Sequence, residues 1–170
     1  MKIRTTVMSV IALVLIAGCA TTPDGPTQEE LIQAALASPV RTDADRERDA
    51  RSHPEEVLRL LDLKPGDKAV DIFGGGGYYA RAIAGITGPD GEVILHNNTP
   101  YAKYVTKQLD DYRANPLPGI SVLVSEVDDL QLGENRLDAA LMVMSFHDTY
   151  YYAPDRGWGD TDVPLFLEQI

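Results

Sequence analysis

The chain has 170 residues, enough for one domain with its own hydrophobic core. It carries 26 acidic residues against 15 lysines and arginines, which gives a net charge of -11. Proteins that bind nucleic acid without regard to its sequence need clustered Lys and Arg to neutralise phosphates, and the sequence contains no basic stripe. The composition therefore argues against nucleic acid as a partner.

The first residues have the layout of an export signal. A short positive start precedes a largely apolar run over residues 7–17, which is too short to span a bilayer. The run ends in Ile16-Ala17-Gly18-Cys19, which resembles the lipobox of bacterial lipoproteins. This resemblance implies cleavage before Cys19 and a diacylglyceryl group on its thiol. The non-acidic Ala20 implies anchoring to the outer membrane, on its periplasmic face. The alternative is an uncleaved apolar start with an idle thiol.

Three segments follow from this interpretation. We expect a signal peptide over residues 1–18, a lipidated cysteine with a tether and a short helix over 19–41, and a folded domain over 42–170. The tether is the polar stretch 21–26, which is typical of a flexible linker. Cys19 is the only cysteine, so no internal disulfide is possible.

The folded part begins with predicted helices over 31–38, 43–52 and 54–61. The first follows a capping-box pattern, and a proline starts the third. The second helix is rich in charge, and Glu47 and Arg51 are spaced for a favourable pair one turn apart. We interpret this second helix as a solvent-exposed charged surface.

From residue 64 onward, predicted strands alternate with helices. The strands cover 68–73, 92–96, 120–124 and 137–144, and the helices cover 78–86, 100–113 and 163–170. This alternation predicts an α/β fold, a Rossmann-like doubly wound parallel sheet with helices on both faces. The final helix lacks a glycine cap, and four parallel strands leave a sheet edge uncovered. We therefore expect the sequence to be truncated at its C-terminus.

Four glycines, Gly74 to Gly77, lie between the first predicted strand and the next helix. Glycines there let the backbone turn sharply and approach a ligand, which the free N–H groups of the helix then face. Gly75, Gly77 and Ala80 satisfy the spacing of dinucleotide-binding loops. That class expects a ribose-binding acid at the end of the second strand, where the sequence has His96-Asn97-Asn98. A nicotinamide oxidoreductase is therefore disfavoured.

The same loop resembles motif I of class I S-adenosylmethionine-dependent methyltransferases, which reads acid, apolar, Gly, any, Gly, any, Gly. The resemblance implies that Asp71 contacts the amino-acid end of the cofactor. Gly75 and Gly77 match the second and third glycines, while Phe73 replaces the first. The family pattern covers roughly residues 45–170 without its last three strands, so the folded domain is similar to the N-terminal part of such an enzyme.

Further positions carry the resemblance. Asn97 falls where the family has the acid that binds the ribose, and an amide can also hydrogen-bond a hydroxyl. Glu126 falls where an acid accepts from the adenine amino group, with Asp128 and Asp129 as nearby alternatives. The glycine run with its two tyrosines, together with the charged residues upstream and a His-Asp pair downstream, looks most like a group of exported predicted methyltransferases.

His147 and Asp148 follow the fourth predicted strand, at the sheet edge that lines ligand crevices in parallel sheets. His147 is a candidate general base near neutral pH, and Asp148 is a candidate to orient it. The tyrosines at 150–152 are candidates to stack on an aromatic substrate. The alternative is a histidine that only hydrogen-bonds a loop, with the tyrosines packed in the core. We assign no metal ligands.

The sequence therefore predicts an S-adenosylmethionine-dependent methyltransferase that acts on a small molecule or an envelope component and is held at the membrane by the lipid on Cys19. S-adenosylmethionine is made in the cytoplasm, whereas the lipobox places the domain outside. The alternative is thus a non-catalytic periplasmic ligand-binding protein with a degenerate methyltransferase fold. Phe73 and Asn97 both favour this alternative.

Overall fold

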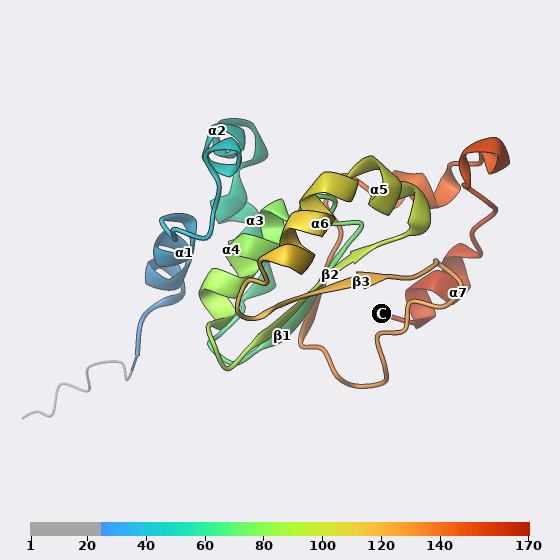
Figure 1. Ribbon diagram of the computed structural model, residues 1–170. Coiled ribbons are helices and arrows are strands. Elements are labelled where there is room, and N and C mark those ends of the chain that lie inside the picture. Colours follow the sequence, from blue (N-terminus) through green and yellow to red (C-terminus); the bar gives the residue numbers. More distant parts are fainter. Residues whose placement is uncertain (1–24) are drawn as a thin grey trace, which may run out of the picture.

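A computed structural model of the chain describes residues 25–170 (Figure 1), so the predicted signal peptide and Cys19 lie outside the described residues. The helices and strands are α1 (Gln28–Leu36), α2 (Asp43–Ser52), α3 (Pro54–Leu61), β1 (Lys68–Ile72), α4 (Tyr78–Thr87), β2 (Glu92–Asn97), α5 (Thr99–Tyr104), α6 (Thr106–Ala114), β3 (Ile120–Val124), β4 (Ala139–Leu141), the 3₁₀ helices η1 (Phe146–Tyr150) and η2 (Pro154–Arg156), and α7 (Val163–Glu168). Within this part of the chain, no helix combines the length and apolar character needed to cross a membrane.

The four strands form one parallel sheet in the order β3-β2-β1-β4. The chain steps outward from β1 to β2 and β3, and then returns to place β4 on the other side of β1. Ligands of open parallel sheets bind outside the carboxyl ends of the strands at such a point of reversal. The predicted α/β fold with a Rossmann-like parallel sheet is confirmed, and the carboxyl end of β1 is where a ligand site is expected.

Side chains of the central strands alternate between two hydrophobic layers, as the pleat of a strand requires. Ala69 and Leu95 pack toward α1, α3, α4 and α6, and Figure 1 shows α4 and α6 lying over the strands. Val70 and Ile94 point to the opposite layer, where Phe166 of α7 is fully buried. Helices therefore cover both faces of the sheet.

Two predicted elements differ most from the structure. The helix expected over 100–113 is two helices, α5 and α6, because the buried Val105 between them adopts non-helical angles of φ -109° and ψ 26°. The strand expected over 137–144 is reduced to the three residues of β4, which pairs only with β1 in the described sheet. Phe73 also leaves the first strand, because its backbone turns into the left-handed region at φ 53°.

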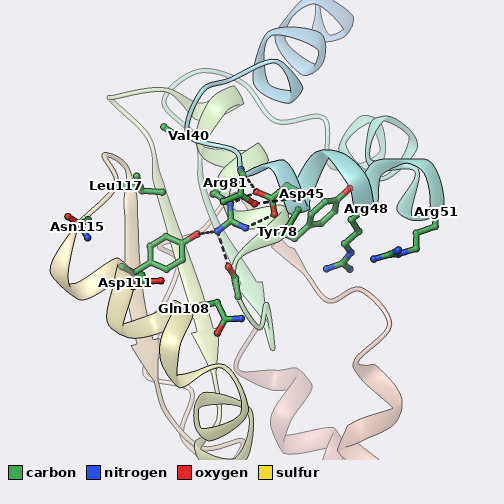
Figure 2. A pocket seen from close by; sticks show the side chains of 14 residues that line it. Val40, Asp45, Arg48, Arg51, Tyr78, Arg81, Gln108, Asp111, Asn115 and Leu117 are labelled. Atoms are coloured by element: carbon green, nitrogen blue, oxygen red, sulfur yellow. Dashed lines mark hydrogen bonds and ion pairs between the residues drawn. The ribbon is translucent and has the colours of Figure 1, made fainter.

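The charged helix α2 is solvent-exposed at Glu47 and Arg51, as expected, but the expectation fails for Asp45, which is buried. Asp45 is only 4% exposed and receives two hydrogen bonds of 2.6 Å from the guanidinium of Arg81 on α4. Arg81 also donates to the carbonyl of Gly76 at 2.9 Å and to the hydroxyl of Tyr112 on α6 at 2.5 Å (Figure 2). One buried guanidinium thus joins α2, the glycine loop and α6. The ion pairs among residues 25–170 do not include the expected pair of Glu47 with Arg51.

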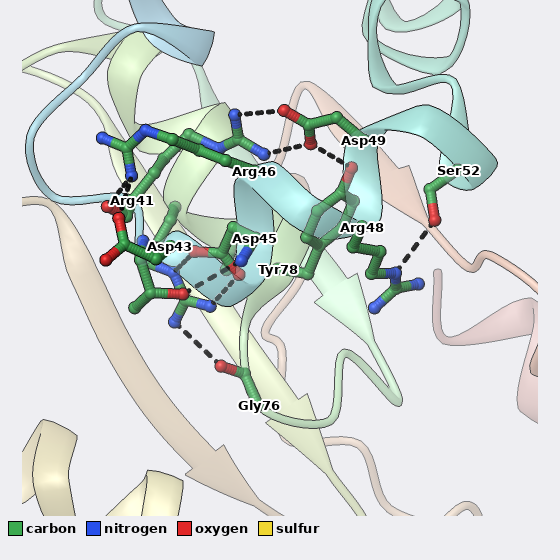
Figure 3. A network of polar contacts seen from close by, with 12 residues as sticks. Arg41, Asp43, Asp45, Arg46, Arg48, Asp49, Ser52, Gly76 and Tyr78 are labelled. Atoms are coloured by element: carbon green, nitrogen blue, oxygen red, sulfur yellow. Dashed lines mark hydrogen bonds and ion pairs between the residues drawn. The ribbon is translucent and has the colours of Figure 1, made fainter.

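A second carboxylate of α2 is engaged in the same way (Figure 3). Asp49 accepts two hydrogen bonds from Arg41, of 2.9 and 2.5 Å, and a third of 2.6 Å from the hydroxyl of Tyr78. Tyr78 begins α4 directly after the glycine loop. The acidic side chains of α2 therefore hold the start of α4 in place, because bidentate arginine–carboxylate pairs fix orientation as well as distance.

We predict that Arg81→Met destabilises the protein by about 3 to 5 kcal/mol, because it leaves Asp45 buried with an uncompensated charge. The matched control is Arg59→Met, which breaks the exposed 2.7 Å pair between Arg59 and Glu29 of α1. That change should cost no more than about 1 kcal/mol. Chemical denaturation of the two variants measures both free energies of unfolding.

The double variant Arg81→Met/Asp45→Asn should recover part of the lost stability, because the amide removes the buried charge and keeps the shape of the side chain. Equal losses in Arg81→Met and Arg59→Met would contradict the role given to the buried pair.

Candidate functional site

The loop Phe73–Gly77 leads from the carboxyl end of β1 into α4. Gly75 and Gly77 both have left-handed backbones, with φ of 58° and 81°. A side chain at Gly77 would collide with the hydroxyl of Tyr112, so this glycine is required by packing. A side chain at Gly75 would meet no atom within 4 Å. Gly75 therefore offers an open backbone surface to a ligand, at the sheet edge where ligands bind.

Asn97, at the end of β2, fixes the position of Gly75. The backbone N–H of Gly75 donates to Oδ1 of Asn97 at 2.9 Å, and Nδ2 of Asn97 donates to the carbonyl of Gly75 at 3.1 Å. Asn97 is fully buried. Because a carboxylate cannot donate, an amide satisfies both backbone groups where an ionised acid would satisfy one. The residue in the ribose-binding position of the family pattern thus holds the glycine loop, with one N–H and one lone pair of the amide left over.

Asp71 lies beneath the loop rather than on its surface. The side chain is buried, and its Oδ2 accepts a hydrogen bond of 3.1 Å from the backbone N–H of Ala80 in α4. Burial raises the pKa of Asp71 to about 7, while the Ala80 N–H and the positive charges of Arg48 and Arg81 act in the opposite direction. The carboxyl under the loop therefore changes its charge near neutral pH.

Phe73, which stands where the family pattern has its first glycine, is the centre of an aromatic cluster. Its ring stacks on Tyr101 with centroids 5.2 Å apart and on Phe166 at 6.2 Å. Trp158 approaches the Tyr101 ring edge-on at 5.6 Å. Offset and edge-on aromatic pairs of this kind add to the energy of burial. The cluster borders the glycine loop, and sequence reasoning missed it because its members are far apart in the chain.

Glu126, expected at the adenine, lies after β3 and is exposed. Its Oε1 accepts hydrogen bonds from the backbone N–H of Thr99, at 3.2 Å, and from the Thr99 hydroxyl. Thr99 begins α5, two residues after Asn97. The structure therefore brings the ends of β2 and β3 together. The alternatives Asp128 and Asp129 are exposed, and their carboxylates accept no hydrogen bond in the described part of the chain.

The candidate catalytic pair lies on η1, after β4. Nε2 of His147 is 3.3 Å from Oδ1 of Asp148, and the His147 side chain is 74% exposed. Oδ2 of Asp148 accepts a hydrogen bond of 2.5 Å from the hydroxyl of Tyr101. Burial and this bond raise the pKa of Tyr101, so the hydroxyl stays a donor. Sequence reasoning missed Tyr101, which connects Asp148 to the Phe73 cluster. The tyrosines at 150–152 are exposed and do not pack in the core.

A cleft of about 680 Å³ lies on the helical side of the loop, between α2 and α6 (Figure 2). Gly76 and Tyr78 border it where the loop enters α4. Arg48 and Arg51 line it from α2, and Gln108 lines it from α6. No residue predicted from sequence for the cofactor or for catalysis lines this cleft, although Gly76 adjoins Gly75.

Comparison with known proteins identifies distant relatives. No family model matches the chain. The ribosomal RNA small subunit methyltransferase H of Geobacter sulfurreducens is 33% identical over 116 residues, which is 66% of this chain and 37% of the relative. A demethylmenaquinone methyltransferase of Bacillus cereus is 28% identical over 117 residues, 68% of this chain and 42% of the relative. The chain thus spans about two fifths of the length of the curated relatives it matches.

Among solved structures, a SAM-dependent methyltransferase from Aquifex aeolicus superimposes with a TM-score of 0.52 at 24% identity, over 76% of this chain and 65% of that one. This similarity concerns the fold. Together with the sequence matches, it makes the chain a distant homologue of S-adenosylmethionine-dependent methyltransferases.

The buried carboxyl of Asp71 predicts a pH-dependent stability. An acid whose pKa is higher in the folded state than in the unfolded state, about 7 against 3.8, makes the protein lose stability as pH rises between these values. Asp71→Asn keeps an acceptor for the Ala80 N–H and removes the charge. The free energy of unfolding of Asp71→Asn, minus that of the native chain, should increase by about 2 to 3 kcal/mol from pH 5 to pH 8.

Denaturant titrations at several pH values measure this difference. Asp110→Asn, on the exposed surface of α6, is the control and should show a constant difference. A constant difference for Asp71→Asn as well would mean that the buried carboxyl has no raised pKa.

Proposed function

We propose that this chain is the cofactor-binding part of an S-adenosylmethionine-dependent methyltransferase. The observation that carries the proposal is the open, left-handed backbone of Gly75 at the carboxyl end of β1, fixed in place by the Asn97 amide. The distant methyltransferase homologues support it. When bound, the cofactor supplies a methyl group on a positively charged sulfur.

Each residue around the loop has a role in this proposal. The space over Gly75 accepts the amino-acid end of the cofactor, while the buried Asn97 acts from beneath by holding the N–H and the carbonyl of Gly75. We propose that Glu126, exposed beyond β3, accepts from an adenine amino group. Asp71 acts through the loop as a positioning residue, because its carboxylate contacts the start of α4 and lies beneath Gly74.

The chemistry required of the protein is modest. Methyl transfer needs the acceptor nucleophile in line with the methyl group, and some acceptors also need a base. We assign the base to His147, whose Nε2 lies within 3.3 Å of the Asp148 carboxylate that orients it. The acceptor is a small molecule or a component of the cell envelope.

A second candidate function is ligand binding without methyl transfer. Two observations favour it: Phe73 replaces a glycine and is stacked within the aromatic cluster, and Asn97 uses its amide to hold the loop. The two functions differ in one measurement, because only the first produces S-adenosylhomocysteine from S-adenosylmethionine when the acceptor is present.

We further propose that the protein is exported and lipid-anchored through Cys19 at the periplasmic face of the outer membrane. The support is the sequence Ile16-Ala17-Gly18-Cys19 after a short apolar run. The polar segment 21–26 would then act as a linker between the lipid on Cys19 and the acidic domain that begins with α1.

We predict that Gly75→Val abolishes binding of S-adenosylmethionine. The valine side chain fills the space over the loop, and a β-branched residue is strained at a φ of 58°. Calorimetric titration measures the affinity, and circular dichroism reports folding. Gly66→Val is the matched control, because Gly66 also has a positive φ and open space but lies in the turn before β1, at the opposite edge of the sheet.

Both variants should lose a similar amount of stability, and only Gly75→Val should lose binding. Unchanged affinity in a folded Gly75→Val protein would remove the cofactor from this loop.

Cys19→Ser should leave a precursor that is neither acylated nor cleaved, because a hydroxyl does not replace the thiol that carries the lipid. Cells grown with a fatty-acid analogue report acylation, and the mobility of the protein on a gel reports cleavage. Thr22→Ser, three residues away, is the control and should be labelled like the native chain. Equal labelling of the Cys19→Ser protein would rule out the lipid anchor.

A further inference from the structure

Two arginines of α2, Arg48 and Arg51, have no carboxylate partner. Neither forms an ion pair with any acid between residues 25 and 170, although the whole chain has 26 acidic residues against 15 basic ones. They lie three residues apart and therefore on the same side of the helix, where like charges repel each other. A bound anion would remove this repulsion.

Arg48 is held in a fixed orientation. Its guanidinium lies 4.2 Å from the centre of the Tyr78 ring, and its Nε donates to the Ser52 hydroxyl at 3.0 Å (Figure 3). The Tyr78 ring is itself fixed, because its hydroxyl donates to Asp49 at 2.6 Å. These contacts leave the two terminal nitrogens of Arg48 without a partner in the described chain. A guanidinium stacked on an aromatic ring keeps its in-plane donors available for a carboxylate or a phosphate.

The acids of the neighbouring cleft do not neutralise this pair. Asp45 is bound by Arg81 at 2.6 Å, and Asp111, on the opposite wall, is bound by Lys107 at 2.9 Å. Figure 2 shows Arg48 and Arg51 reaching from α2 in the same direction, at the end of the cleft away from Asp111. That end of the cleft therefore carries positive charge in an otherwise acidic protein.

The cleft also has the size and position of a substrate site. Its volume of about 680 Å³ is that of a small-molecule pocket. Gly76, which borders it, is the neighbour of Gly75 in the glycine loop. A molecule whose charged group is held at Arg48 and Arg51 therefore has the rest of its structure beside the loop.

We propose that Arg48 and Arg51 bind the carboxylate or phosphate of a small-molecule methyl acceptor in this cleft. The anion site stands on the contacts of the two arginines, and its assignment to the acceptor rests on the proposed methyltransferase function. Because His147 does not line the cleft, an acceptor bound there is one that needs no base from His147. A neutral or cationic acceptor would leave both guanidiniums without a partner.

Calorimetric titration of the full chain with two probes, inorganic pyrophosphate and benzoate, at low ionic strength tests the anion site. The double variant Arg48→Gln/Arg51→Gln should bind the better probe at least about tenfold more weakly, as expected for lost charge-assisted hydrogen bonds. The control is Arg46→Gln, which removes one positive charge from the same helix, away from the cleft lining. It should bind the probe like the native chain.

Three outcomes overturn the proposal: no binding of either probe, equal weakening in the double variant and in Arg46→Gln, or binding only to vesicles of anionic phospholipid with none to the soluble probes. Titration of the same proteins with S-adenosylmethionine separates this proposal from the methyltransferase function. Anion binding without cofactor binding would support the arginine site and contradict the proposed methyltransferase function. Cofactor binding without anion binding would remove the arginine site alone.

Discussion

The buried guanidinium of Arg81 is the contact on which the arrangement of the site depends. It joins three parts of the chain, through Asp45 of α2, the Gly76 carbonyl and the Tyr112 hydroxyl. Burial by itself lowers the pKa of an arginine, but the hydrogen bonds and the charges of Asp45 and Tyr112 together raise the pKa of Arg81, so the guanidinium stays charged. The pairing likewise keeps the pKa of Asp45 low in spite of its burial. The N-terminal helices are therefore part of the site, because they fix the loop that bears Gly75.

The two buried carboxyls near the loop show how pairing decides charge. Asp45 and Asp71 are similarly inaccessible, at 4% and 2% exposure. Asp45 has a bidentate partner and stays ionised, whereas Asp71 has one backbone N–H and a pKa near neutrality. The carboxyl of Asp71 beneath the loop is therefore charged or neutral depending on small changes in pH or in the charges near it. A cationic ligand above Gly75 would favour the charged form of Asp71, even without touching the carboxylate.

The sequence predicted the elements whose signal is local. The strands β1, β2 and β3 and the helix α4 were predicted within one residue of their ends, because buried apolar runs and glycine turns mark them. The break at Val105 was missed, because no glycine or proline marks it in the sequence. The contacts that define the site join residues far apart: Asn97 with Gly75 across 22 positions and Asp45 with Arg81 across 36. No periodicity records such pairs, because they depend on how the layers stack.

The bridge between Asn97 and Gly75 has a consequence for the conformational entropy of the loop. Four successive glycines have more backbone freedom than any other sequence of that length, and a ligand that ordered them would lose much of its binding free energy in doing so. Because the two hydrogen bonds from Asn97 already hold the N–H and the carbonyl of Gly75, the chain loses this freedom when it folds. A molecule arriving at the loop therefore meets a backbone already held at Gly75, and less of its binding free energy is lost in ordering that residue.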